Sequence, residues 1–281
     1  MVEPAVIETG EWPGFERIGV AGPSGMLSAR IGGPADGEAV LFCHSILTSS
    51  AIWARQAASL AARGFRVVCV DMRGHGLSEA VPGPYAMDDL VADIVTVLDV
   101  LELARVHFVG VSQGGMIGFG IGARHQERLA SLLVVGARAD APAPFAAAWD
   151  DRIALVNSER SVENLAFPTA ERWFGADFLR DHPSVRGALL SCIRQTSAEG
   201  FIGCARAIQG LDYISEIPAI RPPAMLAVGE HDALLVQPMR DLQPLFCDCV
   251  FEIIPNAGHL PQVDQPQLFS LLLTKHLNQF V

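Results

Sequence analysis

Short apolar runs alternate with helix-length segments along most of the chain. The runs lie at residues 39–43, 66–70, 106–111, 131–135, 224–228 and 249–254. Several are almost continuous in apolar residues, which is typical of parallel strands covered on both faces. Two earlier runs, at 15–20 and 26–31, alternate less cleanly and predict an antiparallel hairpin at the edge of the sheet.

Helical stretches near 50–63, 88–103 and 113–125 separate the first four runs. In the second stretch apolar residues recur at helical spacing, and Asp88 and Asp89 suit its N-terminal end. Strands that alternate with helices favour a doubly wound, mostly parallel sheet with right-handed crossovers. The sequence therefore predicts the α/β fold class.

The alternation stops after residue 135 and resumes near residue 221. Between them the apolar pattern is helical and contains no convincing strand. We expect a helical cap at residues 139–212, inserted into a core made of residues 1–138 and 213–281. It would cover the carboxyl ends of the strands, where ligands bind in open α/β sheets. The alternative is that these helices only extend the outer layer of the core.

Composition and charge limit which molecules this protein is expected to bind. The 281 residues are 50% hydrophobic, enough for one large core, and the net charge is −11. An acidic surface disfavours nucleic acid and anionic lipid, so we expect a small-molecule substrate, and a homo-oligomer stays open. From the sequence we expect neither a secretory signal nor a membrane-spanning segment. The six cysteines lack a disulfide or zinc pattern, so we expect a reducing, cytoplasmic location.

The strongest chemical signal is Gly110-Val111-Ser112-Gln113-Gly114, a G-x-S-x-G between a strand-like run and a helical stretch. The two glycines leave room for a tight, strained turn that exposes the serine hydroxyl. We expect Ser112 to be a nucleophile. The alternative is a glycine-rich turn in which the serine is passive.

A serine hydroxyl needs an adjacent base, and the base needs a carboxylate to orient it. His259 follows the last strand-like run and is the expected base. Asp232 follows the preceding run, which gives the order Ser, Asp, His expected for this arrangement. Asp140, after an earlier run, is the competing acid, and Glu230 is a third choice.

Acyl transfer also needs donors for the oxyanion. We expect the Gln113 N–H at the start of a helix, and the Ile46 N–H in the loop that follows the run at 39–43. The glycine-rich segment at 71–78 is interpreted as a structural turn in which Asp71 and Arg73 tie loops together. No motif indicates a metal ion or a dinucleotide.

Four segments carry a family resemblance: VDMRGHGLSEAVPGPYAMDDL, VGVSQGGMIGFGIGARHQERL, ERWFGADFLRDHP and PNAGHLPQVDQPQLF. Over about residues 25–281 the chain resembles the α/β-hydrolases, and among them the 3-oxoadipate enol-lactonases. The resemblance implies hydrolysis of an enol-lactone in aromatic catabolism without a cofactor, with catalytic roles for Ser112, Asp232 and His259. It also places Arg172 and Trp173 near the substrate pocket.

The chain departs from that family in two loops. The oxyanion loop reads His44-Ser45-Ile46-Leu47-Thr48, and the segment after the fourth run reads Gly136-Ala-Arg138-Ala-Asp140. Both are expected to line the pocket, which leaves room for a different substrate on the same catalytic groups. Arg138 and the cap arginines Arg152, Arg172 and Arg194 are candidates to hold a substrate carboxylate, and the alternative is that they are solvated.

Three functions follow from these observations. The leading hypothesis is a hydrolase that cleaves a small carboxylic ester or lactone through an acyl-enzyme. The second uses the same site to hydrolyse a C–C bond in a diketone-like ring-cleavage product. The third is a non-catalytic receptor that binds a ligand in the pocket.

Overall fold

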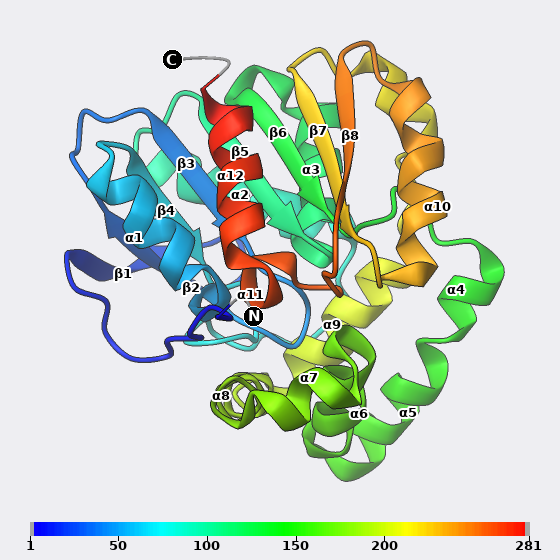
Figure 1. Ribbon diagram of the computed structural model, residues 1–281. Helices are drawn as coiled ribbons and strands as arrows, with labels where there is room; N and C mark the ends of the chain where they lie inside the picture. The colour runs from blue at the N-terminus through cyan, green and yellow to red at the C-terminus, as the bar shows by residue number, and fades with distance from the viewer. Residues whose placement is uncertain (1–2, 279–281) are drawn as a thin grey trace.

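The strands form one sheet that organises the whole molecule (Figure 1). The computed structural model describes residues 3–278. Its eight strands lie in the order β1-β2-β4-β3-β5-β6-β7-β8. They are β1 (Phe15–Ala21), β2 (Met26–Gly32), β3 (Ala39–Cys43), β4 (Arg66–Val70), β5 (Val106–Val111), β6 (Leu129–Val135), β7 (Ala224–Gly229) and β8 (Cys249–Ile254). The pairs from β4 to β8 are parallel, and the α/β class is confirmed.

The predicted hairpin is also confirmed, because β1 pairs with β2 and β2 with β4 in antiparallel fashion. The central strands β3, β5 and β7 are buried along their whole length, as the continuous apolar runs predicted. β6 starts two residues earlier than the apolar run, at Leu129, because β5 and β6 already pair there before an irregularity in register at Val106/His107.

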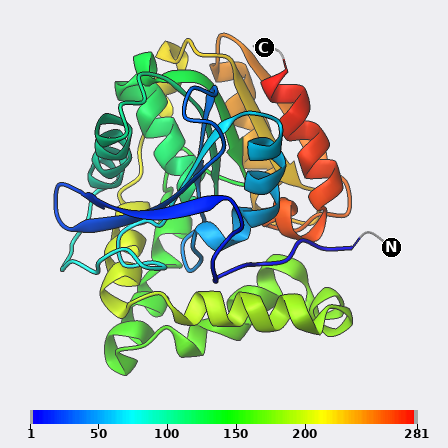
Figure 2. The same cartoon turned by 90° about the vertical axis from the view of Figure 1, so that its left-hand side faces the viewer.

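Helices cover both faces of the sheet. They are α1 (Ala54–Ala62), α2 (Met87–Val100), α3 (Gln113–Arg124), α10 (Ala233–Leu242), α11 (Pro261–Asp264) and α12 (Pro266–Leu277), with 3-10 turns η1 (Ser50–Trp53), η2 (Gln126–Arg128), η3 (Ile214–Ala219) and η4 (Gln243–Leu245). Figure 2 shows α12, in red, on the opposite side of the sheet from α2, in teal. α2 ends before the predicted residue 103, because Glu102 takes a φ of 55° and breaks the helix.

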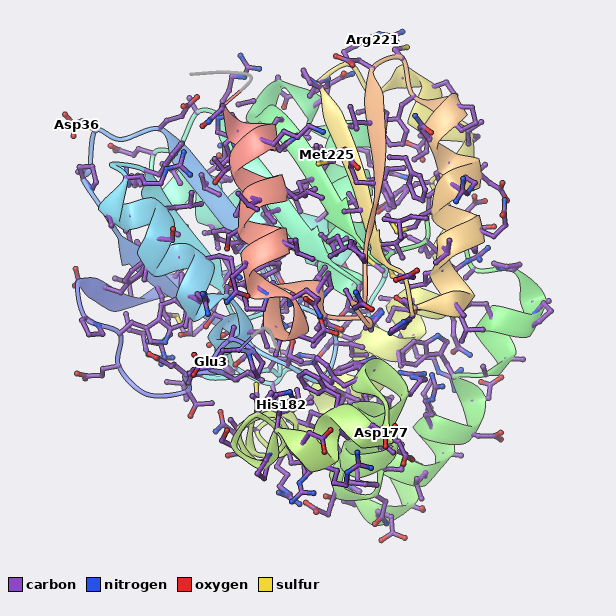
Figure 3. The ribbon with its side chains drawn as sticks, viewed as in Figure 1. Glu3, Asp36, Asp177, His182, Arg221 and Met225 are labelled. Carbon is purple, nitrogen blue, oxygen red and sulfur yellow. The ribbon has the colours of Figure 1, made fainter. Side chains whose placement is uncertain are left out.

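Between β6 and β7 the chain forms helices α4 (Ala143–Ala147), α5 (Asp150–Glu159), α6 (Glu163–Phe174), α7 (Ala176–Asp181), α8 (Pro183–Arg194) and α9 (Ala198–Gln209). They lie together beyond one end of the sheet (Figure 1). In Figure 3, Asp177 and His182 mark this end, and Arg221, which precedes β7, marks the other. The helices therefore lie at the carboxyl ends of the parallel strands.

We infer from this arrangement that residues 139–212 form a cap on a core of residues 1–138 and 213–281, of which 1–2 and 279–281 fall outside the described residues. Backbone contacts join the two parts: Ser197 N donates to Gly74 O over 2.8 Å, and His259 N donates to Trp173 O over 2.9 Å. Among residues 3–278, no helix combines the length and the apolar character needed to cross a membrane.

Candidate active site

Ser112 sits on a sharp turn between β5 and α3. Its φ is 55° and its ψ −118°, a left-handed conformation that a residue with a side chain rarely adopts. The flanking glycines make the turn possible. A Cβ on Gly110 would lie 2.3 Å from Gly114 O, and a Cβ on Gly114 would lie 2.4 Å from Cys43 O. The strain predicted from the G-x-S-x-G pattern is therefore present, and the turn leaves Ser112 on the wall of a pocket.

His259 and Asp232 meet on the same pocket. The Nδ1 atom of His259 lies 2.6 Å from Oδ2 of Asp232. Because a carboxylate only accepts hydrogen bonds, Nδ1 carries the proton and Nε2 of the neutral ring is left as a base. Both side chains are about nine-tenths buried, at 10% and 12% exposure. The competing acids bind elsewhere: Asp140 accepts from Arg138 over 2.7 Å, and Glu230 accepts from Asn256 N over 2.9 Å.

Two backbone N–H groups near Ser112 have no acceptor within residues 3–278. Ile46 lies in the loop after β3 and lines the pocket, and Gln113 is the first residue of α3. Neither N–H donates a hydrogen bond within the part of the chain that the structure describes. The two segments are tied together, because Gly114 N donates to His44 O over 3.1 Å. Unpaired N–H groups at a helix start suit a developing negative charge.

Two neutral histidines hold the loop that carries Ile46. His75 Nε2 accepts from Leu47 N over 3.1 Å, and His44 Nε2 accepts from Met72 N over 2.8 Å. Burial, and then His44, lower the pKa of His75 to about 3, so that it stays an acceptor. The turn at 71–78 does tie loops together: Asp71 accepts from Ser50 N over 2.8 Å, and Arg73 is in ionic contact with Asp93 at 2.6 Å.

The pocket has a volume of about 570 Å³ and lies between core and cap. Its core side includes the five residues Ile46, Ser112, Met116, Asp232 and His259, and its cap side includes Phe145, Trp149, Arg152, Arg172 and Trp173. A mostly apolar wall with a few convergent polar groups is typical of a small-molecule site. No cluster of three or more His, Cys, Asp or Glu side chains suited to a metal ion occurs among residues 3–278.

Three arginines reach this pocket, and they differ in their partners. Arg138, the last core residue before the cap, forms an ion pair with Asp140. Arg152 lies over the Trp149 ring at 4.9 Å, and neither it nor Arg172 forms an ion pair or hydrogen bond with the described residues. Arg172 is exposed by its accessible surface, yet protein atoms surround its guanidinium group. Desolvation, followed by repulsion from Arg152 and opposed by Asp232, lowers its pKa to about 10. Two unpaired cations side by side favour an anionic ligand.

The other arginine candidate, Arg194, does not reach the pocket. It forms an ion pair with Glu163 at 2.7 Å on the exposed face of the cap. Arg194 is therefore a solvated arginine of the cap.

Two further residues act on the loop that carries His259. Trp173, expected beside the substrate, lines the pocket and also stacks on the His259 ring, with centroids 5.5 Å apart. Asp264, which the sequence analysis missed, accepts from Gly258 N over 2.6 Å, and burial raises its pKa to about 7. Its signal was a carboxylate five residues after His259 in PNAGHLPQVDQPQLF, within a segment noted only for its resemblance.

Comparison with known proteins gives consistent matches. The family model described as alpha/beta hydrolase fold matches residues 38–266. A 3-oxoadipate enol-lactonase 2 of Acinetobacter baylyi is 32% identical, over 88% of this chain and 91% of that protein. A putative carbamate hydrolase RutD of Caulobacter segnis is 38% identical, over 85% of this chain and 91% of that protein. The crystal structure of the enol-lactonase from Burkholderia xenovorans superposes with a TM-score of 0.87 at 29% identity, covering 93% of this chain and 100% of that one.

Proposed function

This chain belongs to the alpha/beta hydrolase fold family, and from that premise we propose that it is a serine hydrolase that cleaves a small carboxylic ester or lactone through an acyl-enzyme. The observation that carries the proposal is the 2.6 Å contact between His259 and Asp232 on the pocket that Ser112 lines. Relatives named as enol-lactonases support the choice of an ester or lactone.

The reaction proceeds in two halves. Nε2 of His259 accepts the hydroxyl proton of Ser112 as Oγ bonds to the substrate carbonyl carbon, and Asp232 stabilises the imidazolium. The Ile46 and Gln113 N–H groups bind the oxyanion. The C–O bond of the leaving group then breaks as that group takes the proton from His259. In the second half a water molecule gives a proton to His259 as its oxygen bonds to the acyl carbon. The bond from this carbon to Oγ of Ser112 then breaks, Oγ takes the proton back from His259, and the acid leaves.

The substrate bears a carboxylate besides the bond that is cleaved. Arg152 and Arg172 line the pocket without an ion pair or hydrogen bond to a described side chain, and the attraction of Asp232 for Arg172 does not offset its desolvation and the repulsion from Arg152. This repulsion is relieved when an anion binds between the two arginines. Arg138 is already paired with Asp140 and contributes less to this site. The acidic surface elsewhere gives no attraction to such a substrate, so recognition is local.

A second candidate is hydrolysis of a carbamate by the same three residues. The specific observation in its favour is the 38% identity to a putative carbamate hydrolase. Hydrolysis of a C–C bond in a diketone-like compound, and ligand binding without catalysis, remain predictions that no observation here favours.

The test uses a fluorophosphonate probe, which labels an activated serine, followed by a panel of lactones, esters, carbamates and β-diketones with and without a carboxylate. Ser112→Ala should abolish labelling and lower kcat by about 10⁴-fold or more. The matched control, Ser184→Ala on the exposed face of α8, should do neither. Labelling and turnover that survive Ser112→Ala would refute the mechanism, and a preference for carbamates or diketones would replace the substrate class.

A further inference from the structure

The C-terminal end of α6 rests on the loop that carries His259. α6 ends at Phe174, so the carbonyl of Trp173 belongs to the last turn, whose carbonyls have no partner within the helix. The backbone N–H of His259 donates to this carbonyl over 2.9 Å. The approach is close enough that a Cβ on Gly258 would lie 2.0 Å from the same oxygen. A cap helix thus makes a direct contact with the residue that serves as base.

The side chain of Trp173 extends this contact to the imidazole ring. The two rings stack with centroids 5.5 Å apart and planes 25° from parallel, and Trp173 is only 3% exposed. Asp232 holds one edge of the imidazole through Nδ1, and the indole covers one face. These two contacts fix both the direction and the plane of the ring, which decides where Nε2 points.

Both features of α6 favour positive charge on His259. The C-terminal end of a helix is the negative end of its dipole. The face of an indole is negative as well, and a cation placed over it within about 6 Å is stabilised by roughly 0.5–2 kcal/mol. In the active enzyme, where the ring starts neutral, His259 becomes positive as it takes the proton of Ser112, so the stabilisation is larger in the transition state than in the free enzyme.

We propose that Trp173 is a positioning residue for the general base, which orients the His259 ring and stabilises its imidazolium form. This inference rests on the proposed function. It gives the cap a part in catalysis besides substrate recognition, because movement of α6 away from the core would remove the stacked ring and the carbonyl together.

Other charged groups near His259 also influence its protonation. Asp232 on the loop after β7 favours the imidazolium, and so does Asp264 on α11 when it is ionised. Arg172 on α6 and Arg152 on α5 oppose it, and His231 lines the same pocket. The test therefore changes the ring of Trp173 and leaves these groups in place.

The rate of Ser112 labelling by a fluorophosphonate, measured from pH 5 to 9 on the full chain, reports the base without knowledge of the natural substrate. Labelling needs neutral His259, so loss of the stacked ring should move the midpoint of this profile to lower pH. For Trp173→Leu we expect a downward shift of about 0.5 pH unit and a plateau about 3–10-fold lower. Trp173→Phe keeps an aromatic face and should stay within about 0.2 pH unit of the unsubstituted protein.

Two controls separate this role from general loosening of the pocket. Phe174→Leu removes the neighbouring aromatic ring of α6, one that stacks on Phe178 and does not line the pocket, and should leave the midpoint unchanged. Fluorinated tryptophan weakens the negative ring face at nearly constant volume. It should lower the midpoint in the unsubstituted chain and have no effect in the Trp173→Phe background.

The outcomes are distinct. A Trp173→Leu profile with an unchanged midpoint, an equal shift in Phe174→Leu, or a fluorotryptophan effect that persists in Trp173→Phe would overturn the inference. Failure of the unsubstituted protein to label at Ser112 would instead overturn the proposed function. If Trp173→Leu does not fold, the fluorotryptophan comparison decides the question alone.

Discussion

Replacement of Asp264 by asparagine should remove a large pH dependence of stability. Asp264 ends α11 and is 5% exposed. Its Oδ2 accepts from Gly258 N over 2.6 Å, whereas its Oδ1 has no hydrogen-bond partner within residues 3–278. Burial outweighs the backbone hydrogen bonds and raises the pKa of this carboxyl to about 7. The folded protein therefore holds the proton more tightly than the unfolded chain does.

The size of the effect follows from the two pKa values. The unfolded value is about 3.9, so the shift of about 3 units corresponds to about 4 kcal/mol. As pH rises from about 4 to about 7, the unfolded chain loses the proton while the folded protein keeps it, and the free energy of unfolding falls. About 3 kcal/mol of this loss lies between pH 5 and pH 8.5.

Asp264→Asn is neutral at both pH values, and its amide oxygen can still accept from Gly258 N. Leaving the amide NH₂ without a partner costs roughly 1–3 kcal/mol at every pH. The diagnostic quantity is therefore the change, between pH 5 and pH 8.5, in the stability difference between variant and unsubstituted protein. We expect this difference to move by about 3 kcal/mol in favour of the variant.

Urea unfolding followed by tryptophan fluorescence at the two pH values measures this quantity directly. Asp177→Asn, at a side chain that is 86% exposed, is the matched control and should parallel the unsubstituted protein. A change of less than about 1 kcal/mol in the Asp264→Asn difference would refute the reasoning, because it would mean that the carboxyl is already ionised near its ordinary pKa.

Three further outcomes are expected. Arg172→Leu should lower kcat/KM for a carboxylate-bearing ester by about 10–100-fold and leave that for its neutral analogue unchanged, since a charged hydrogen bond contributes about 1.5–3 kcal/mol. Equal losses of kcat/KM for the two esters in steady-state kinetics would contradict this. Gly114→Ala should lower the thermal unfolding midpoint, because its Cβ would lie 2.4 Å from Cys43 O, and an unchanged midpoint would count against the tight turn at Ser112. His75→Phe removes the acceptor of Leu47 N and should lower kcat by a larger factor than it changes KM. The free energy of unfolding measured in urea should fall by about 1–3 kcal/mol.

Much of the fold could be predicted because its signals are local. Continuous apolar runs marked the central strands, and the weakly alternating runs marked the antiparallel hairpin of β1 and β2. Helix ends were less accurate, because α2 stops where Glu102 takes a positive φ and no residue pattern marks that change.

The candidate site also has features that local sequence predicts and features that only the packing decides. The serine turn could be predicted because two glycines within five residues permit it on steric grounds alone. The choice between Asp232 and Asp140 stayed open, because each follows a strand and only the packing shows that Asp140 turns to Arg138. The same holds for the arginines, whose identical side chains acquire different partners from their surroundings.

By itself the sequence determined the alternation of strands and helices, the strained turn at Ser112 and the order of its candidate partners, since periodicity and steric exclusion act over a few residues. The tertiary structure alone decided that α6 ends on His259, that Trp173 covers its ring and that Asp264 is buried beneath its loop. These contacts join segments far apart in the chain, and their strength depends on burial, which no local pattern encodes.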